Sequence, residues 1–423
     1  MTAAPRSGLL RAVLTLVAGG AIAQALPLLL TPWLSRLYTP AQFGEYTLFA
    51  AVAANLAVAA CGRYEFALPL VTDDGEAARL RTLCLRLLAG ATAASALGAL
   101  GWLAWSSHAW TLWLPLAVAA LGWLSLATLW ATRAQAYRPM AIARVVQYGG
   151  GSLAQVVAGL LGAGVSGLIA APIAAAAAAA ALLRLPLRGG AEPAPGRLMA
   201  LMRRFRDFPL LNTPHAFAGA LQDTLAIALL TAWQGQAAAG FWGLALRYLK
   251  APATLVGGAV SQTLYPQLAA HGATVDRGEG STQAADAPQR VTREGRAAVR
   301  RVMASLAAIA APLVLLLWAI GPWAFERLFG PQWRDAGELA RALALYIGFH
   351  FVAAPLAVVT LAWGAQGWAL RLAIVGQVAF VAALAAGLQL GGLQGAGWAV
   401  SAAMMLYFGY YFVRLATWPL TGT

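Results

Sequence analysis

The strongest constraint on this chain is a series of long apolar stretches that recurs along its whole length. A helix needs about 20 consecutive apolar residues to cross the hydrocarbon core of a bilayer, and twelve stretches approach or exceed that length. Short segments that carry arginine separate most of them. The predicted spans are 11–35, 43–70, 80–104, 110–131, 142–162, 167–185, 208–232, 240–266, 302–322, 338–362, 367–388 and 396–416.

The composition supports an all-α polytopic membrane protein. The chain is 61% hydrophobic and 10% charged, whereas soluble domains carry about 25% charged residues. A net charge of +14 would suit a nucleic-acid partner only if it formed a basic patch on a soluble fold. Here the arginines lie between apolar runs, so we expect the partner to be the lipid bilayer and not nucleic acid.

The distribution of positive charge predicts the topology. Of the 29 Lys and Arg residues, 22 fall in segments that are cytoplasmic if the N-terminus is inside. Arg36, Arg327 and Arg334 fall in the opposite loops, and the other four lie within or at the ends of spans. Because cytoplasmic loops are enriched in Lys and Arg, we predict a bacterial inner-membrane protein with both termini in the cytoplasm.

The N-terminus has a second interpretation. Arg6 and Arg11, followed by an apolar stretch and Ala21-Ile22-Ala23, resemble a signal peptide with its cleavage site. The apolar run continues to Trp33, beyond the length of a typical signal core. This favours a first membrane span.

Two longer cytoplasmic loops predict the domain organisation. The segment 186–206 is rich in Pro and Gly, as flexible linkers are, and divides the chain into an N-terminal lobe (1–185, spans 1–6) and a C-terminal lobe (207–423, spans 7–12). The second loop, 268–300, ends in an arginine cluster that includes Arg296 and Arg300. The cluster could form a basic helix on anionic headgroups; ordinary positive-inside charge is the favoured interpretation.

A weak internal repeat relates the two halves. The segments 39–48 and 235–244 each end a small-residue loop with Gly and an aromatic residue before the next span. Their glycines, Gly44 and Gly240, are 196 residues apart. Six intervening spans preserve orientation, so the halves would be parallel repeats, with substrate at the midplane between them.

Several short motifs, spread in order along nearly the whole chain, resemble the polysaccharide-transport (O-antigen flippase) family. This family shares a superfamily, the multidrug/oligosaccharidyl-lipid/polysaccharide (MOP) flippases, with lipid II flippases and multidrug and toxin extruders. The motifs are Thr31-Pro32-Trp33-Leu34-Ser35-Arg36-Leu37-Tyr38-Thr39-Pro40, Phe43-Gly44, Arg63-Tyr64-Glu65, Phe208-Pro209, Ala239-Gly240-Phe241, Leu328-Phe329-Gly330-Pro331-Gln332-Trp333 and Ala336-Gly337.

The resemblance implies a V-shaped fold of two six-helix lobes, with spans one, two, seven and eight around a central cavity. It also implies a flippase that moves undecaprenyl-pyrophosphate-linked oligosaccharides (O-antigen, capsule or exopolysaccharide units) to the periplasmic leaflet. Polysaccharide polymerase machinery would be a partner. The alternative within the superfamily is a cation-coupled multidrug exporter, whose cavity should be acidic.

Charged and polar side chains inside spans are the default functional candidates, because each charge at mid-helix costs about 2.5–3.5 kcal/mol on insertion scales. At 100° per residue, those of the seventh span fall within an arc of about 100°, and those of the eighth share one face. Such polar faces would suit a diphosphate and its counter-charge. The alternative is that Arg247 and Lys250 snorkel to the interface or form a structural salt bridge with Asp223. The seventh-span residues are Asn212, His215, Gln222 and Asp223, and the eighth-span residues are Arg247, Lys250, Thr254 and Ser261.

Three further charges are candidates with two interpretations each. Arg63 and Glu65 are about 200° apart on a helix, so at most one of them lines the cavity; the pair is equally a structural lock. Arg36 could draw the pyrophosphate toward the periplasm or anchor the interface.

No nucleotide-binding Gly-x-x-x-x-Gly-Lys-Ser/Thr motif is present. We therefore expect no cofactor or metal, and coupling to a proton or sodium gradient with Asp223 and Glu65 as the ion-coupling carboxylates. A membrane-embedded glycan-processing enzyme would need a catalytic constellation on large periplasmic loops. The loops here are short, and the mid-span His350 is expected to be a packing residue.

Overall fold

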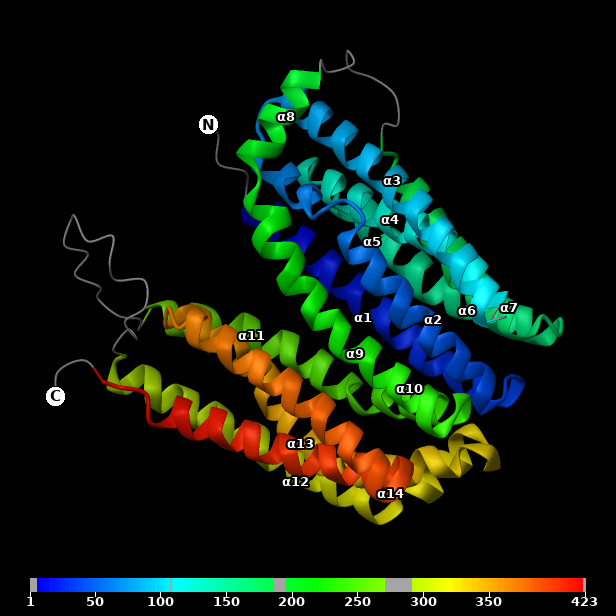
Figure 1. The fold of residues 1–423 in the computed structure, drawn as a ribbon. Coiled ribbons are helices and arrows are strands. Elements are labelled where there is room, and N and C mark those ends of the chain that lie inside the picture. Colours follow the sequence, from blue (N-terminus) through cyan, green and yellow to red (C-terminus); the bar gives the residue numbers. More distant parts are fainter. Residues whose placement is uncertain (1–5, 107–108, 186–194, 271–290, 421–423) are drawn as a thin grey trace. The chain divides into compact units, whose positions relative to one another are not determined.

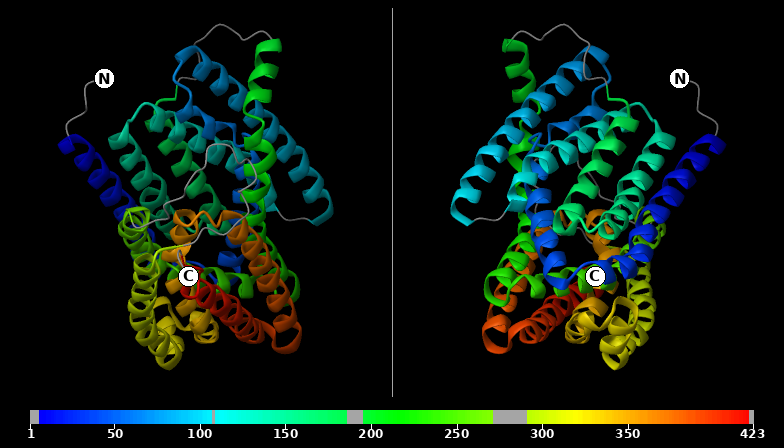
Figure 2. Two further views of the ribbon diagram at one scale, coloured as in Figure 1. Left: turned by 90° about the vertical axis from the view of Figure 1, so that its left-hand side faces the viewer. Right: turned by 90° about the vertical axis from the view of Figure 1, so that its right-hand side faces the viewer.

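Helices make up nearly all of the computed structural model, and Figures 1 and 2 draw coils and no arrows. The structure describes residues 6–106, 109–185, 195–270 and 291–420, without the side chains of some residues in α1, α3, α8, η4, α9 and α11. In these ranges the one β-type pairing is an isolated bridge between Val291 and Leu420. The chain divides into two units, Met1–Thr231 and Ala232–Thr423.

Among its described residues, the first unit contains nine α-helices, the last of which continues past its boundary, and four short 3₁₀ or π segments. In chain order these are α1 (Arg6–Leu37), α2 (Pro40–Ala59), η1 (Tyr64–Leu70), α3 (Asp74–Ser106), η2 (Ala109–Trp113), α4 (Leu114–Arg133), α5 (Tyr137–Val145), η3 (Val146–Gly150), α6 (Gly151–Leu160), α7 (Gly164–Leu182), α8 (Pro195–Arg204), η4 (Phe208–Asn212) and α9 (Thr213–Gln234).

The second unit contains longer helices, with α13 packed against α12, α14, α11 and α10. In the described chain it consists of α10 (Gln236–Leu249), α11 (Ala251–Ala270), α12 (Arg293–Phe329), η5 (Pro331–Trp333), α13 (Arg334–Ala362) and α14 (Gln366–Ala416).

The helices have the length and hydropathy that membrane crossing requires. Among the described residues, six helical segments could each span a bilayer, and α2 with η1 makes a seventh if this pair, bent by 54°, is one span. The 51-residue α14 is long enough for two crossings and has non-helical backbone at Gly391 and Gly392. All twelve predicted ranges fall on helical segments, several of them interrupted.

The predicted second span, 43–70, is not one continuous helix. Thr39 caps the start of α2 reciprocally with Gln42, and α2 ends at Ala59. Gly62 and Arg63 then both adopt positive φ angles, 58° and 60°, and a 3₁₀ helix follows. Glycine adopts this left-handed conformation without steric cost, so Gly62 explains why the helix stops here.

The predicted flexible linker is partly helical. Residues 186–194 lie outside the described chain, but Pro195–Arg204 forms α8. Leu198 and Leu201 are buried in the core of the first unit, and the Arg204 guanidinium pairs with Glu76 on α3. A cavity of about 300 Å³ lies beside this contact, and none of the predicted site residues lines it.

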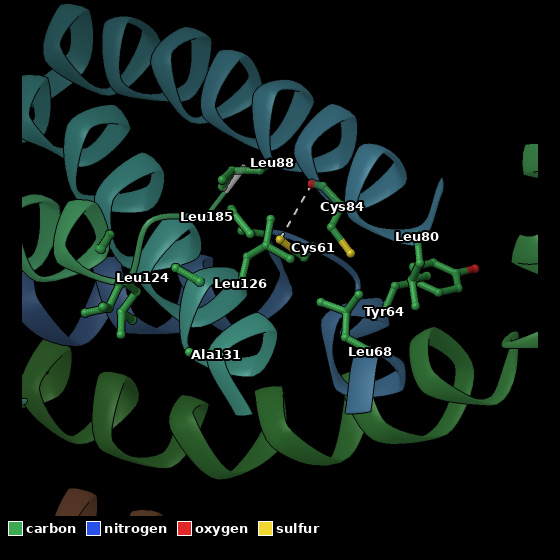
Figure 3. Packing of buried hydrophobic residues seen from close by; sticks show 14 of the residues in the cluster. Cys61, Tyr64, Leu68, Leu80, Cys84, Leu88, Leu124, Leu126, Ala131 and Leu185 are labelled. Atoms are coloured by element: carbon green, nitrogen blue, oxygen red, sulfur yellow. Dashed lines mark hydrogen bonds between the residues drawn. The ribbon is translucent and has the colours of Figure 1, made fainter. Parts of the chain in front are cut away.

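The core of the first unit surrounds the break after α2. Figure 3 shows Cys61, Tyr64 and Leu68 packed with Leu80 and Cys84 of α3. The Cys61 thiol lies 3.7 Å from the Cys84 carbonyl oxygen. Both cysteines are buried and unbridged.

Candidate functional site

The break after α2 places Arg63 against the seventh span. Its Nε donates a hydrogen bond to Asn212 Oδ1 at 3.2 Å, and its guanidinium lies 4.2 Å from the centre of the Phe66 ring. Asn212 ends the π-helix η4, whose second residue is Pro209. The two predicted residues Arg63 and Asn212 are therefore in direct contact.

Glu65 points into the protein interior. It is 2% exposed, and the Ser125 hydroxyl on α4 lies 3.4 Å from its Oε1. Its Oε2 has no hydrogen-bond partner in the described structure. The predicted angle of about 200° between Arg63 and Glu65 does not apply, because Arg63 lies in a turn and Glu65 in a 3₁₀ helix; the two side chains nevertheless contact different partners.

A second contact joins α2 and α9. The Asn55 side-chain amide donates to the Thr224 hydroxyl at 3.0 Å, and this hydroxyl lies 3.2 Å from the Ala51 carbonyl oxygen. Asn55 is 5% exposed, so the contact is buried. Sequence reasoning missed both residues, although a lone Asn in the apolar run of α2 is a detectable signal.

The predicted stripe on the seventh span lies on α9, apart from Asn212. Gln222 is half-buried and Asp223 is exposed. His215 is helical, and its side chain lies outside the described part of the chain. The neighbouring Thr224 faces α2, so the Asp223 side chain leaves the helix about 100° away from that contact.

The predicted eighth span is divided in two. The helix α10 ends at Leu249, Lys250 caps it, and α11 begins at Ala251. Pro252 has no N–H to continue the helical ladder, which explains the interruption beside Lys250. The four predicted polar residues of the eighth span therefore do not share the face of one continuous helix.

The polar residues beyond Lys250 bond to backbone. The Thr254 hydroxyl donates to the Lys250 carbonyl oxygen at 3.0 Å. The Ser261 hydroxyl donates to the Pro355 carbonyl oxygen on α13 at 3.1 Å. Ser261 thus joins α11 to α13, while Arg247 and Lys250 are half-buried charges beside the interruption between α10 and α11.

Lys250 belongs to a cluster with aromatic side chains that sequence reasoning missed. Its Nζ lies 5.9 Å from the centre of the Tyr346 ring. The Tyr346 ring is 5.9 Å from the His350 ring and 6.5 Å from the Phe408 ring, centre to centre. One helical turn separates Tyr346 and His350 on α13, so both can face Lys250.

The remaining predicted charges lie at helix ends. Arg36 is exposed in the last turn of α1. In the cluster before the ninth span, Arg296 and Arg300 donate to the Trp418 and Ala416 carbonyl oxygens, at 3.2 and 2.9 Å. Ala416 is the last residue of α14, so Arg300 caps that helix, whereas Trp418 lies two residues beyond its end. Arg290 lies outside the described chain.

Solved transporter structures superimpose on this chain. An inward-facing multidrug resistance MATE family transporter of the MOP superfamily has a TM-score of 0.60 at 14% identity, covering 95% of this chain and 94% of its own. Lipid II flippase MurJ, in an inward closed conformation, has a TM-score of 0.67 at 9% identity, covering 95% and 89%. The chain has the fold of the MOP transporters.

This fold confirms the predicted all-α, polytopic architecture and a multi-pass membrane protein. A mutant of the Vibrio cholerae MATE transporter VcmN is a third similar structure, with a TM-score of 0.52 at 13% identity. No known sequence family and no curated protein match the chain. The likeness to solved structures is thus one of fold.

Proposed function

We propose that this chain is a flippase that carries polyprenyl-pyrophosphate-linked oligosaccharides, such as O-antigen, capsule or exopolysaccharide units, from the cytoplasmic to the periplasmic leaflet of the inner membrane. The observation that carries the proposal is the sign of the charge inside the second unit. Arg247 and Lys250 lie in the interior of its spans, and no acidic residue does. The seven carboxylates after Thr231 are Asp276, Glu279, Asp286, Glu294, Glu326, Asp335 and Glu338.

The positive sign favours an anionic substrate. A pyrophosphate and its sugars cannot enter hydrocarbon, whereas a polyprenyl tail can remain there, so the headgroup needs a basic and hydrated route. Charge-assisted hydrogen bonds from Arg and Lys are among the strongest that a phosphate receives. The similar structure titled lipid II flippase supports a lipid-linked substrate.

Net transport needs an energy source, for which we propose a proton or sodium gradient. Glu65 and Asp223 are the carboxylates of the first unit that lie inside predicted spans away from their ends. We propose that Asp223 exchanges a cation while Arg247 or Lys250 releases the phosphate. If Asp223→Asn kept full dependence on the gradient, this part of the proposal would be wrong.

Reconstitution tests the substrate. Wild-type chain in proteoliposomes should flip a fluorescent polyprenyl-pyrophosphate oligosaccharide, and Arg247→Ala or Lys250→Ala should each slow flipping by at least about tenfold, because a charged hydrogen bond contributes about 1.5–3 kcal/mol. Arg371→Ala is the matched control. It removes one positive charge near the start of α14, where the guanidinium bonds only weakly to the Gly367 carbonyl oxygen, and should leave flipping unchanged.

The competing function has its own support, since MATE multidrug transporters are among the similar structures. Uptake of organic cations, together with no flipping of any anionic glycolipid, would assign the chain to that class. Equal rates of flipping by wild type and both variants would show that Arg247 and Lys250 do not bind the anionic headgroup.

A further inference from the structure

A cavity of about 300 Å³ lies on the predicted cytoplasmic side of the first unit, between the start of α3 and the end of α8. The described residues that line it are Glu76, Arg79, Ala200, Leu201 and Arg204. Residues three or four apart share one face of a helix, so each of the two helices presents one face to the cavity. The volume is at the lower end of the range for ligand pockets, about 300–1,000 Å³.

The helix α8 is held beside α3 by its apolar face (Figure 1). Leu198 and Leu201 are buried in the core of the first unit, and the Tyr64 hydroxyl lies 3.4 Å from the Met202 carbonyl oxygen. In contrast, the Arg204 side chain is 65% exposed. Because apolar packing fixes the helix, its position does not depend on the charged side chains at the cavity.

Two guanidinium groups and one carboxylate line the cavity, which gives its described lining one net positive charge. Arg204 Nη1 lies 2.5 Å from Glu76 Oε1. Arg79 Nη2 lies 3.8 Å from Asp73 Oδ2, which is too far for a hydrogen bond, and this oxygen accepts the Glu76 backbone N–H at 2.6 Å. A guanidinium has five N–H donors, so Arg79 and Arg204 both retain donors for a ligand.

The segments around the cavity are basic and lie next to predicted spans. Residues 73–86 and 195–207 together carry seven arginines and four acidic residues. One of these acids, Asp74, pairs with Arg133 on α4 at 2.7 Å. Predicted spans start at residues 80 and 208, directly after Arg79 and shortly after Arg204, so we expect the cavity at the level of the cytoplasmic headgroups. Phosphate is the anion that lipids present at this level.

We propose that this cavity binds the phosphate of a lipid headgroup through Arg79 and Arg204, and that the phosphate takes the place of Glu76 on Arg204. Phosphate oxygens accept paired N–H bonds from the planar guanidinium group. The ligand chemistry is that of a phosphodiester or a pyrophosphate ester, which bilayer phospholipids and lipid-linked precursors share. The site goes beyond the proposed function and does not depend on it.

The test measures the Kd of two phosphate lipids for the full-length chain in detergent micelles. One is phosphatidylglycerol. The other is polyprenyl pyrophosphate, added to a chain that already carries Arg247→Ala and Lys250→Ala, so that the proposed transport site does not contribute. Arg79→Gln and Arg204→Gln should each weaken binding of the lipid that occupies the cavity by about tenfold, as loss of a charged hydrogen bond does.

Two further variants separate a binding site from a structural ion pair. Glu76→Gln removes the carboxylate that competes for Arg204 and should tighten binding severalfold. Arg203→Gln removes an equal charge from the adjacent exposed position of α8, which is not among the described lining residues, and should leave the Kd unchanged. Without lipid, these variants should melt at the wild-type temperature, because exposed ion pairs contribute little to folding.

The outcomes distinguish the lipid and the site. Weaker binding in both lining arginine variants, with tighter binding in Glu76→Gln, supports the proposal, and the lipid that shows this pattern is the ligand. Equal Kd values for wild type, Arg79→Gln and Arg204→Gln with both lipids overturn it. An equal loss of binding in Glu76→Gln and Arg204→Gln also overturns it, because the pair would then be structural. These results leave the flippase proposal standing, since that proposal concerns Arg247 and Lys250.

Discussion

Arg63 has a backbone conformation that costs a residue with a side chain about 1–2 kcal/mol. Such conformations persist where surrounding contacts determine them. Here the Asn212 hydrogen bond and the Phe66 ring hold the guanidinium. The strained residue therefore lies where the second span bends and contacts the seventh.

Comparing Arg63→Gly with Arg63→Ala separates the backbone from the side chain. Both variants lose the Asn212 contact, but only glycine relieves the positive φ. We expect Arg63→Gly to be about 1 kcal/mol more stable than Arg63→Ala in thermal unfolding. Both should slow transport if the contact is functional; equal stability would contradict the proposed strain.

The Asn55–Thr224 contact should show measurable coupling. Side-chain hydrogen bonds between membrane helices average about 0.6 kcal/mol and reach about 1.7. A double-mutant cycle of Asn55→Ala and Thr224→Val should return a coupling energy in that range. Additive effects would mean that the two side chains act independently.

Candidate site residues could be predicted from the sequence where a charge interrupts an apolar run, as with Arg63, Glu65 and Lys250. The residues that contact them could not be predicted. The aromatic residues Tyr346 and Phe408 resemble ordinary packing residues in sequence, and only the fold places them beside Lys250. His350 was expected to pack, and it does contact rings, but its nearness to a lysine 100 residues earlier has no local signal.

Among the helices, α14 is interrupted at two glycines, and only one of them, Gly392, has a backbone conformation that requires glycine. Gly392 has φ 59° and ψ −146°, close to a region that essentially only glycine adopts. Gly391 has negative φ, and an added Cβ there would meet nothing within 4 Å. The separation of the eleventh and twelfth spans thus depends on Gly392.

Gly392→Ala should therefore cost about 1–3 kcal/mol, while Gly391→Ala should stay within about 0.5 kcal/mol of wild type. Thermal unfolding of the two purified variants in one detergent measures the difference. Equal melting temperatures would show that the backbone at this break is not constrained as described.

The end of α14 depends on arginines of another helix. Arg300→Ala removes a hydrogen bond to the Ala416 carbonyl oxygen and should cost about 1 kcal/mol. Arg301→Ala removes the same charge from an exposed neighbouring position and should be nearly neutral. Equal losses in thermal unfolding would argue that net charge, rather than capping, accounts for the effect.

The long apolar stretches predicted where helices occur but not where they break. The interruptions follow from backbone chemistry at Gly62, Pro252 and Gly392, which a count of apolar residues does not weigh. The basic cluster before α12 shows the same limit. Its density suggested a lipid contact or topology alone, whereas Arg300 also caps α14 and Arg296 bonds to the Trp418 carbonyl oxygen just beyond that helix.

For the whole molecule, topology remains a prediction that labelling can decide. In a chain with Cys61 and Cys84 replaced by Ala, a membrane-impermeant maleimide added outside intact inner-membrane vesicles of right-side-out orientation should label Leu161→Cys and Leu390→Cys. Both positions are highly exposed, at 79% and 89%. Leu161 lies at the predicted periplasmic end of the fifth span, and Leu390 lies in a predicted periplasmic turn.

The same reagent should not reach Arg138→Cys or Arg371→Cys until the membrane is permeabilised, because both lie in predicted cytoplasmic segments. The reverse pattern would invert the predicted orientation. One probe in each unit for each side tests both halves together.

Lys250 has a consequence for chemical labelling, because it is the only lysine in the sequence. An amine-reactive ester can modify just this side chain and the α-amino group. A fluorophore installed there, without any substitution, would sit beside the Tyr346 ring and respond to its stacking environment. The unaltered chain thus already provides a single optical reporter at the interruption between α10 and α11.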